Sequence, residues 1–435
     1  MKNMKKLIIM SMLFPLSAFA VGSESDELKQ EIIELKQRLS QLERTLNKAT
    51  KIKSPTKKVK HKEITVADVE AKEQPEKTEK KAFSPSIQVG GAISTEIGGY
   101  KDKKTKQNYS SNVRNAKLKA YGMVHEDVGF MVEVDFAGDQ HKLKKAYVNY
   151  FGMAPVEVRI GRFIQDFGIN QDDLFPESHP HTCLSEFNET GVRVLTHGER
   201  WYSSVGFASN NFGTTKNNEI DQSKTLFLRA SYAPIYNETN VVHTGISYAH
   251  HMPKSSASKI TFKQRFENKF LDDGISASIT NIDNIDSYGA DLGFIHGPFS
   301  IQGEFTEAKV SRLARLRASK LKGGYLQMAY SFTGEQREYD PRFNKFSAIT
   351  PKENFSFKNS GKGAWELAVR YSHVNLNGKD DLVGGKMKNL STSLNWYLNK
   401  NLNVMFNYIH GKTDKNATIP NNKADIYLVK VNFYF

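Results

Sequence analysis

The last twelve residues of the chain, 424–435, alternate between two chemically different faces. One face is aromatic and β-branched and includes Tyr427 and Phe433, whereas the other carries Lys430 and Asn432. This period of two predicts a β-strand with one side toward lipid and one side toward a wet interior. A closed barrel protects such a strand, because its last strand pairs with its first; the alternative is an edge strand of a soluble sheet.

Similar alternation recurs from Ser86 onward, in segments separated by turns rich in Gly, Asn, Asp and Lys. We count about fifteen to seventeen such segments, and bacterial single-chain barrels contain even numbers of strands. The predicted fold class is therefore all-β, a transmembrane antiparallel β-barrel of about sixteen strands that encloses an aqueous channel rather than a packed core. Three longer irregular segments are predicted to be extracellular or inward-folding loops, one of which sets the channel width: 165–188, 252–286 and 333–361.

The barrel is expected to occupy residues 83–435, and three other segments precede it. Residues 1–20 have the charged start, short apolar core and small-residue cleavage site of a signal peptide. Residues 24–48 are predicted to form a periplasmic α-helical coiled coil and to self-associate, most simply as a trimer; an amphipathic helix packed on its own barrel is the alternative. The predicted heptad seam consists of Leu28, Ile32, Leu35, Leu39, Leu42 and Leu46. Residues 49–82, mixed basic and acidic, are predicted to be a disordered linker.

Composition narrows the function further. The net charge is +14 and the excess of Lys and Arg persists within the barrel region, so that a basic lumen would attract small anions rather than nucleic acid. The single cysteine excludes an internal disulfide framework. No nucleophile elbow, nucleotide loop or His-Glu-x-x-His motif is present, and we expect neither an enzyme nor a cofactor.

The alternation also predicts which charged side chains face the lumen, because Arg or Lys facing lipid near mid-membrane costs about 2–4 kcal/mol. Arginine can bind a phosphoryl oxygen pair through two donors, and lysine offers a compact charge. The predicted anion path consists of Lys117, Lys119, Lys145, Arg159, Arg193, Arg229 and Arg370. In the alternative interpretation these cations pair with acids and stiffen the wall; the expected acids are Glu133, Asp135, Glu157 and Glu366.

Three smaller clusters are candidate binding sites. Arg312, Arg315 and Arg317 are predicted to lie in a short helix or an outer loop that is solvated, contacts lipopolysaccharide or gathers anions. The run from His179 through His181 to Cys183 lacks the ligand spacing of structural zinc sites, so no metal is expected. The two adjacent histidines, His250 and His251, are predicted to lie in a loop.

Four stretches resemble the phosphate-selective porin O and P family. They read GPFSIQGEFTEAKV at 297–310, YLQMAYSFTGEQREYDP at 325–341, GAWELAVRYSHVNL at 363–376 and LNWYLNKNLNVMFNY at 394–408. The resemblance implies a homotrimer of sixteen-stranded barrels whose anion-selective lumen is lined by Arg and Lys. The aromatic terminus, Phe435, resembles the assembly signal that the barrel-assembly machinery of outer membranes reads.

The sequence as a whole predicts an outer-membrane porin that passes small anions, such as phosphate or polyphosphate, by passive diffusion. Its other expected partners are outer-membrane lipid, lipopolysaccharide and peptidoglycan. Two alternatives stay open: a weakly selective general porin, and a tether that joins the outer membrane to the cell wall through the coiled coil.

Overall fold

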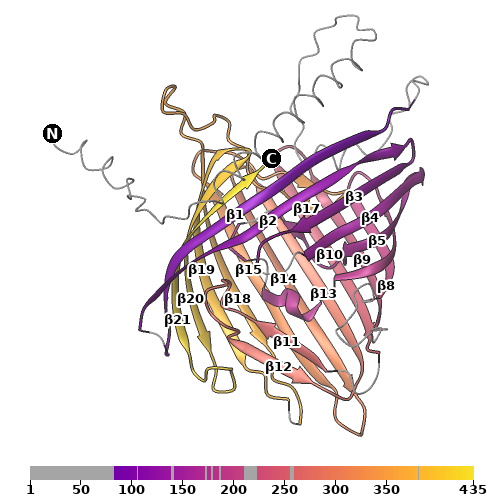
Figure 1. Ribbon diagram of the computed structural model, residues 1–435, viewed down its shortest axis with the longest axis vertical. Helices are drawn as coiled ribbons and strands as arrows, with labels where there is room; N and C mark the ends of the chain where they lie inside the picture. The colour runs from indigo at the N-terminus through magenta and orange to yellow at the C-terminus, as the bar shows by residue number, and fades with distance from the viewer. Residues whose placement is uncertain are drawn as a thin grey trace, which may run out of the picture. The chain divides into compact units, whose positions relative to one another are not determined.

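The computed structural model describes residues 83–104, 106–138, 142–171, 174–177, 180–185, 188–209, 223–254, 259–380 and 382–435. Within them, sixteen antiparallel strands close into a barrel (Figure 1). The barrel strands are β1 Ser86–Lys101, β2 Asn108–His125, β3 Val128–Asp135, β4 Lys142–Met153, β5 Val156–Ile164, β7 Asn188–His197, β8 Trp201–Ser209, β9 Lys224–Tyr236, β10 Asn240–Met252, β13 Ile282–His296, β14 Phe299–Arg312, β15 Ser319–Ser331, β18 Ala364–Asn375, β19 Lys386–Asn399, β20 Leu402–Thr413 and β21 Lys423–Tyr434. The predicted fold class and strand number are confirmed.

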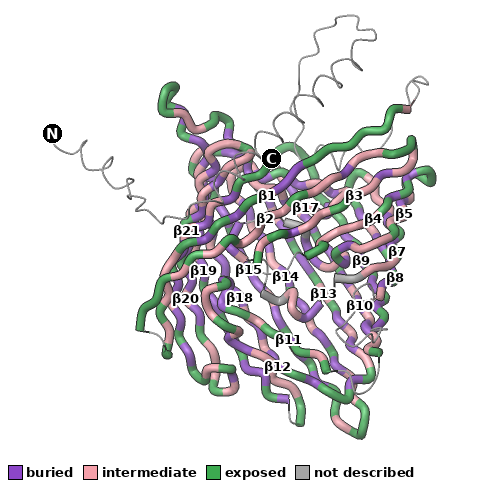
Figure 2. Tube along the Cα trace, in the orientation of Figure 1, coloured by how far each residue is buried: buried purple, intermediate pink, exposed green. Residues whose placement is uncertain are grey.

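The predicted alternation sets the two faces of the barrel wall. On β21, Tyr427 and Phe433 are 59% and 43% exposed on the outside, whereas Lys430 and Asn432 are almost completely buried inside. The alternation of buried and exposed positions runs along most strands (Figure 2). Strand β21 pairs with β1, and the backbone of Phe435 extends the ladder through two hydrogen bonds with Gly91, of 2.7 and 3.1 Å. The closure predicted from the last strand is therefore confirmed. No helix in the described part of the chain is long and apolar enough to cross a membrane.

The two ends of the barrel differ in the length of their connections. One end, where the C-terminus lies, has mostly short turns, such as those at 126–127, 297–298 and 400–401. The opposite end carries longer connections, including 165–187 and 253–281. We call these the short-turn end and the long-loop end. In outer-membrane barrels the short turns face the periplasm.

Three connections contribute structure inside the barrel. Loop 165–187 contains β6 Asn170–Gln171 and the 3-10 helix η1 Pro180–Leu184, and loop 253–281 contains the hairpin of β11 Ile260–Gln264 and β12 Ile275–Ile279. Segment 332–363 contains β16 Tyr339–Asp340 and β17 Lys345–Phe346, and β17 pairs with β6 in parallel. Segment 332–363 leaves the short-turn end. Of the two predicted alternatives, extracellular or inward-folding, the second applies, because β17 pairs with β6 and Phe346 packs against the inward-facing His243.

The inserted connections fill part of the lumen with an apolar core. Leu184, Phe262, Phe266 and Ile275 from the two loops pack against inward-facing apolar residues near the long-loop end, which include Ile285, Val310, Leu321, Val374, Met387, Ile409 and Ile426. The prediction of an aqueous channel without a packed core is therefore wrong for this half of the barrel. The wall can be apolar there because loops, rather than water, cover it.

Candidate anion path along strands β2 to β5

The inward face of strands β2 to β5 is basic and only half-buried. The register places Lys117 opposite Asp135 and Lys119 opposite Glu133, and Glu133 in turn lies opposite Lys145. On the next pair of strands, Arg159 lies opposite the inward-facing Asn149. Four of the seven cations predicted for the anion path therefore share one face with the predicted acids Glu133 and Asp135.

Two further cations belong to this face, and the alternation did not predict them. A bulge in β4 lies between Leu143 and Lys145, and it brings Lys144 into the electrostatic field of Lys117 and Asp135. A second irregularity, in the pairing of β1 with β2, lies at Arg114 itself, and the guanidinium of this residue binds Glu177 at 2.6 Å. A strict period of two cannot locate bulges, because each bulge shifts the register by one residue.

Aromatic rings hold two of these cations in place. The guanidinium of Arg159 lies 3.9 Å from the ring centre of Tyr147, and its Nε donates to Asn149 at 2.7 Å. The ammonium of Lys119 lies 5.2 Å from the ring centre of Tyr121. Cation–π contacts of this kind orient the charge and leave it positive.

Cations outnumber carboxylates on this face. Among the described side chains of β2 to β5, Lys117 lies 4.0 Å from Glu133, with 30% and 13% of the side chains exposed, and such half-exposed pairs are weak. Asp135 accepts the backbone N–H groups of Ala116 and Ala137, at 3.0 and 3.1 Å. An uncompensated positive field in a narrow, partly solvated passage concentrates small anions.

The other three cations predicted for the path are buried in ion pairs. Arg193 pairs with Asp166, and Arg229 pairs with Asp291, which also lies 2.7 Å from His243. Arg370 lies 3.5 Å from Glu267 and donates to Gln327 at 2.9 Å. These three arginines therefore fit the alternative interpretation, in which the cations pair with acids within the wall rather than line the anion path. Their acids, Asp166, Asp291 and Glu267, were not predicted.

Two of the predicted acids pair elsewhere. Glu157 lies 3.6 Å from His197 on β7. Glu366 on β18 forms a two-donor ion pair with Arg337 of segment 332–363, at 2.9 and 2.6 Å, and accepts the hydroxyl of Tyr397 at 2.9 Å. Glu366 therefore holds the segment that enters from the short-turn end rather than a cation of the path.

Loop 165–187 is held against the wall by its first residues. Burial alone would raise the pKa of Asp166, but the guanidinium of Arg193 and hydroxyl groups that donate to the carboxylate lower it. Gly168 adopts a left-handed backbone (φ +75°), and a Cβ at this position would lie 2.0 Å from the carboxylate of Glu304. The same carboxylate accepts the N–H of Ile169 at 3.1 Å. The loop therefore lies close against the inner wall.

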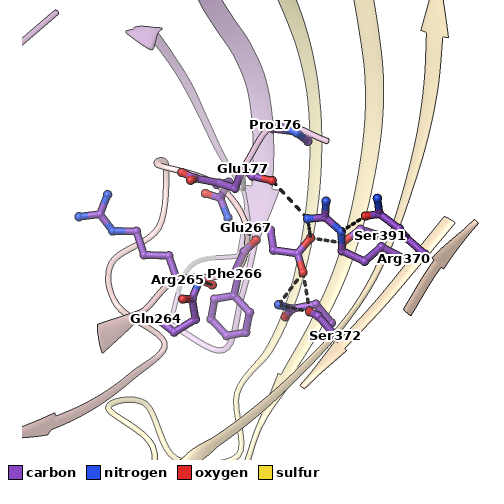
Figure 3. A network of polar contacts seen from close by, with 12 residues as sticks. Pro176, Glu177, Gln264, Arg265, Phe266, Glu267, Arg370, Ser372 and Ser391 are labelled. Atoms are coloured by element: carbon purple, nitrogen blue, oxygen red, sulfur yellow. Dashed lines mark hydrogen bonds and ion pairs between the residues drawn. The ribbon is translucent and has the colours of Figure 1, made fainter. Parts of the chain in front are cut away.

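A second polar network fixes both loops to strands β18 and β19 (Figure 3). Glu267, fully buried in loop 253–281, accepts hydrogen bonds from Ser372 at 2.5 Å and from Ser391 at 2.8 Å. Arg370 lies beside Glu267 and also donates to the backbone carbonyl of Glu177, at 3.2 Å. This side of the lumen is thus occupied by protein, while the basic face of β2 to β5 stays accessible.

The minor clusters contribute no site. Arg312 ends β14, and Arg315 and Arg317 lie in the loop after it, where Arg317 pairs with Asp380 at 2.9 Å; a short helix is not formed. The histidines at 250–251 lie on β10 rather than in a loop, and His250 pairs with Asp286 on the outer face.

The remaining predictions fall partly outside the described residues. Cys183 lies in η1, whereas His179 and the side chain of His181 are outside the described part. Among the side chains that are described, no cluster could hold a metal ion. The signal peptide, the coiled-coil seam and the linker all precede residue 83 and are also outside the described part.

Comparison with known proteins agrees with the barrel. The family model for phosphate-selective porins O and P matches residues 87–435. Porin O of Pseudomonas aeruginosa is 25% identical over 386 residues, which cover 78% of this chain and 85% of that protein. An anion-selective porin from Comamonas acidovorans has a TM-score of 0.50 at 13% identity, covering 81% of this chain and 100% of that one. The outer membrane channel DcaP of Acinetobacter baumannii has a TM-score of 0.50 at 10% identity, covering 82% and 99%.

Proposed function

We propose that this chain, which belongs to the phosphate-selective porin O and P family and is therefore an outer-membrane porin, passes small anions by passive diffusion along the inner face of β2 to β5. The observation that carries the proposal is the excess of half-buried cations on that face, next to a lumen side filled by protein. Anions would move between neighbouring cations, each too weak a site to trap them. The short-turn end would face the periplasm.

Phosphate is the proposed preferred anion. The family name and the relative called Porin O support this choice. The chemistry of the face is also suitable, because Arg159 can offer two parallel donors and Lys117, Lys144 and Lys145 offer point charges at short spacing. A phosphate ion could therefore exchange its hydration shell for several weak contacts in succession.

The test is electrical. Refolded full-length protein in a planar bilayer, under a potassium chloride gradient, should give a zero-current potential of the sign for anion selectivity, and added phosphate should block chloride current in a saturable way. The triple variant K117Q/K119Q/K145Q should lose most of this selectivity and weaken the phosphate block. The matched control K386Q/K388Q removes lysines from the outer face of β19 and should change neither. Cation selectivity, or none, in the unaltered protein would leave a general porin.

A trimer is the proposed assembly. The outer face of β2 to β5 is apolar and exposed at Leu118, Val132, Val148 and Ile160, which suits contact with neighbouring protomers as well as lipid. The heptad seam of residues 24–48 would add a second contact.

The same N-terminal residues support a second candidate function, a tether to peptidoglycan. Deletion of residues 24–81 tests it: a tether predicts loss of cell-wall association with unchanged conductance. Unchanged cell-wall association after the deletion would exclude this function.

A further inference from the structure

The outer surface of the barrel carries a row of lysines near the long-loop end, concentrated on the strands from β14 to β21. We define the lysine belt as the outward-facing lysines of β14, β15, β19, β20 and β21, namely Lys309, Lys320, Lys322, Lys386, Lys388, Lys412 and Lys423. Both chain neighbours of each belt lysine on the strand are more buried than the lysine itself, which fixes the outward direction. On β2, β4, β5 and β8, many exposed outward positions near the same end are uncharged, as at Tyr109, Val113, Leu143, Ile164 and Phe207, whereas Arg162 on β5 and Lys224 on β9 are isolated cations.

The belt brings like charges face to face. Lys388 lies directly opposite Lys412, and Lys412 lies directly opposite Lys423. On the other side of β19, Lys388 faces His373, and Lys309 faces Lys320 between β14 and β15. Like charges directly opposite in a sheet are destabilising, and neighbouring strands are only about 4.8 Å apart. Such an arrangement is stabilised when an anion lies between the charges.

The nearby carboxylates do not neutralise the centre of the belt. Glu307 is shared by Lys320 and Lys322, at 2.8 and 3.0 Å. Asp425 is bound to His410 at 2.7 Å. In the part of the chain that the structure describes, no ion pair is found for the ammonium groups of Lys388, Lys412 and Lys423.

The height of the belt points to the class of ligand. Directly below it, toward the middle of the wall, the outer face changes to exposed aromatic rings, among them Tyr371, Tyr408 and Tyr427. The rings of Tyr408 and Tyr427 stack at 4.9 Å. Aromatic girdles mark the boundary between hydrocarbon and headgroups. The belt therefore lies at headgroup height, above a lipid-facing apolar surface.

We propose that the lysine belt binds the phosphate groups of an anionic lipid of the outer leaflet, with Lys388, Lys412 and Lys423 as the central site. The acyl chains of such a lipid would lie on the apolar wall below the belt, which a free anion could not contact. This inference rests on the outer-membrane location of the barrel but not on its anion permeability. The lipid-binding experiment can therefore fail while the test of anion selectivity succeeds, and anion selectivity can be absent while lipid binding is found.

The test is native mass spectrometry of full-length protein in detergent with bis-phosphorylated lipid A. The variant K388Q/K412Q should retain lipid A at least about tenfold more weakly than the unaltered protein, since each of the two lysines near an anionic headgroup contributes about fivefold. The control K117Q/K119Q also removes two positive charges, but from the lumen, and this variant should retain lipid A as strongly as the unaltered protein does. Lipid A without its phosphates should bind the unaltered protein as weakly as intact lipid A binds the belt variant.

Thermal unfolding gives an independent measurement. Without lipid, K388Q/K412Q should unfold at the same temperature as the unaltered protein or at a higher one, because like-charge repulsion is removed. Added lipid A should raise the unfolding temperature of the unaltered protein and of the lumen control K117Q/K119Q, but not that of K388Q/K412Q. Equal lipid A binding by all three proteins would overturn the proposal. So would displacement of lipid A by millimolar inorganic phosphate, which would make the belt a collector of free anions.

Discussion

The two sides of the lumen carry the same kinds of side chain and use them differently. On β2 to β5, Lys117, Lys119, Lys145 and Arg159 remain half-buried among too few carboxylates. On the rest of the wall, which begins at β7 directly beside β5, the arginines of β7, β9 and β18 are buried, and each is paired with an acid. In both parts of the wall these side chains point into the lumen.

What differs is whether a second element supplies a counter-charge. Asp166 and Glu267 come from inserted loops, and Asp291 comes from β13 two strands along the wall from Arg229. A buried arginine without such a partner would be very costly, so burial and pairing occur together. If the proposed anion path is correct, a lumen-facing cation is available to passing anions only where no neighbouring element supplies a buried counter-charge.

The largest expected effect comes from breaking a buried pair. Asp291→Ala removes the carboxylate that pairs with Arg229 and His243, and Arg229 is only 2% exposed. The substitution should therefore lower the free energy of unfolding by about 3–5 kcal/mol. Glu133→Ala on the accessible face should cost less than about 1 kcal/mol. Urea unfolding in detergent measures both. The double variant R229M/D291L should recover most of the loss, and a D291A effect as small as that of E133A would contradict the comparison.

A smaller effect is expected where loop 165–187 touches the wall. Gly168→Ala combines a left-handed backbone with a Cβ directed at the carboxylate of Glu304, so the loop must move away from the wall and into the lumen. We expect a lower single-channel conductance and a loss of about 1–3 kcal/mol of stability. Gly138→Ala is the matched control, because Gly138 has φ +88° but no atom within 4 Å of the added Cβ. An unchanged conductance in G168A would show that this loop does not limit the passage.

Much of this architecture follows from sequence alone. Strand alternation predicted the closed barrel and the inward direction of Lys117, Lys145 and Arg370, because a side-chain period of two is local. It could not predict the partners Asp166 and Glu267, which lie in loops without a period. It also missed Lys144, because a bulge shifts the register, and it left open whether segment 333–361 is extracellular or folds inward, because loop length does not indicate which end a connection leaves.

The smallest expected effect is a pH dependence of the anion selectivity. It would arise at Glu177, which contacts both Arg114 on the basic face and Arg370 on the filled side of the lumen. Burial raises the pKa of this glutamate above its ordinary value, although Arg114 at 2.6 Å opposes the shift. A carboxyl group with a raised pKa takes up its proton first as the pH falls, and protonation leaves Arg114 with only Glu96, at 3.7 Å, as a counter-charge. Anion selectivity should therefore increase modestly as the pH is lowered from neutral toward the range in which ordinary glutamates titrate.

Zero-current potentials of the unaltered protein and of Glu177→Gln, recorded across this range, measure the effect. The variant carries no proton-dependent charge at this position, so it should already show the higher selectivity at neutral pH and should change little on acidification. If both proteins responded equally to pH, another group would be responsible. The link between the filled side of the lumen and the basic face through Arg114 would then be absent.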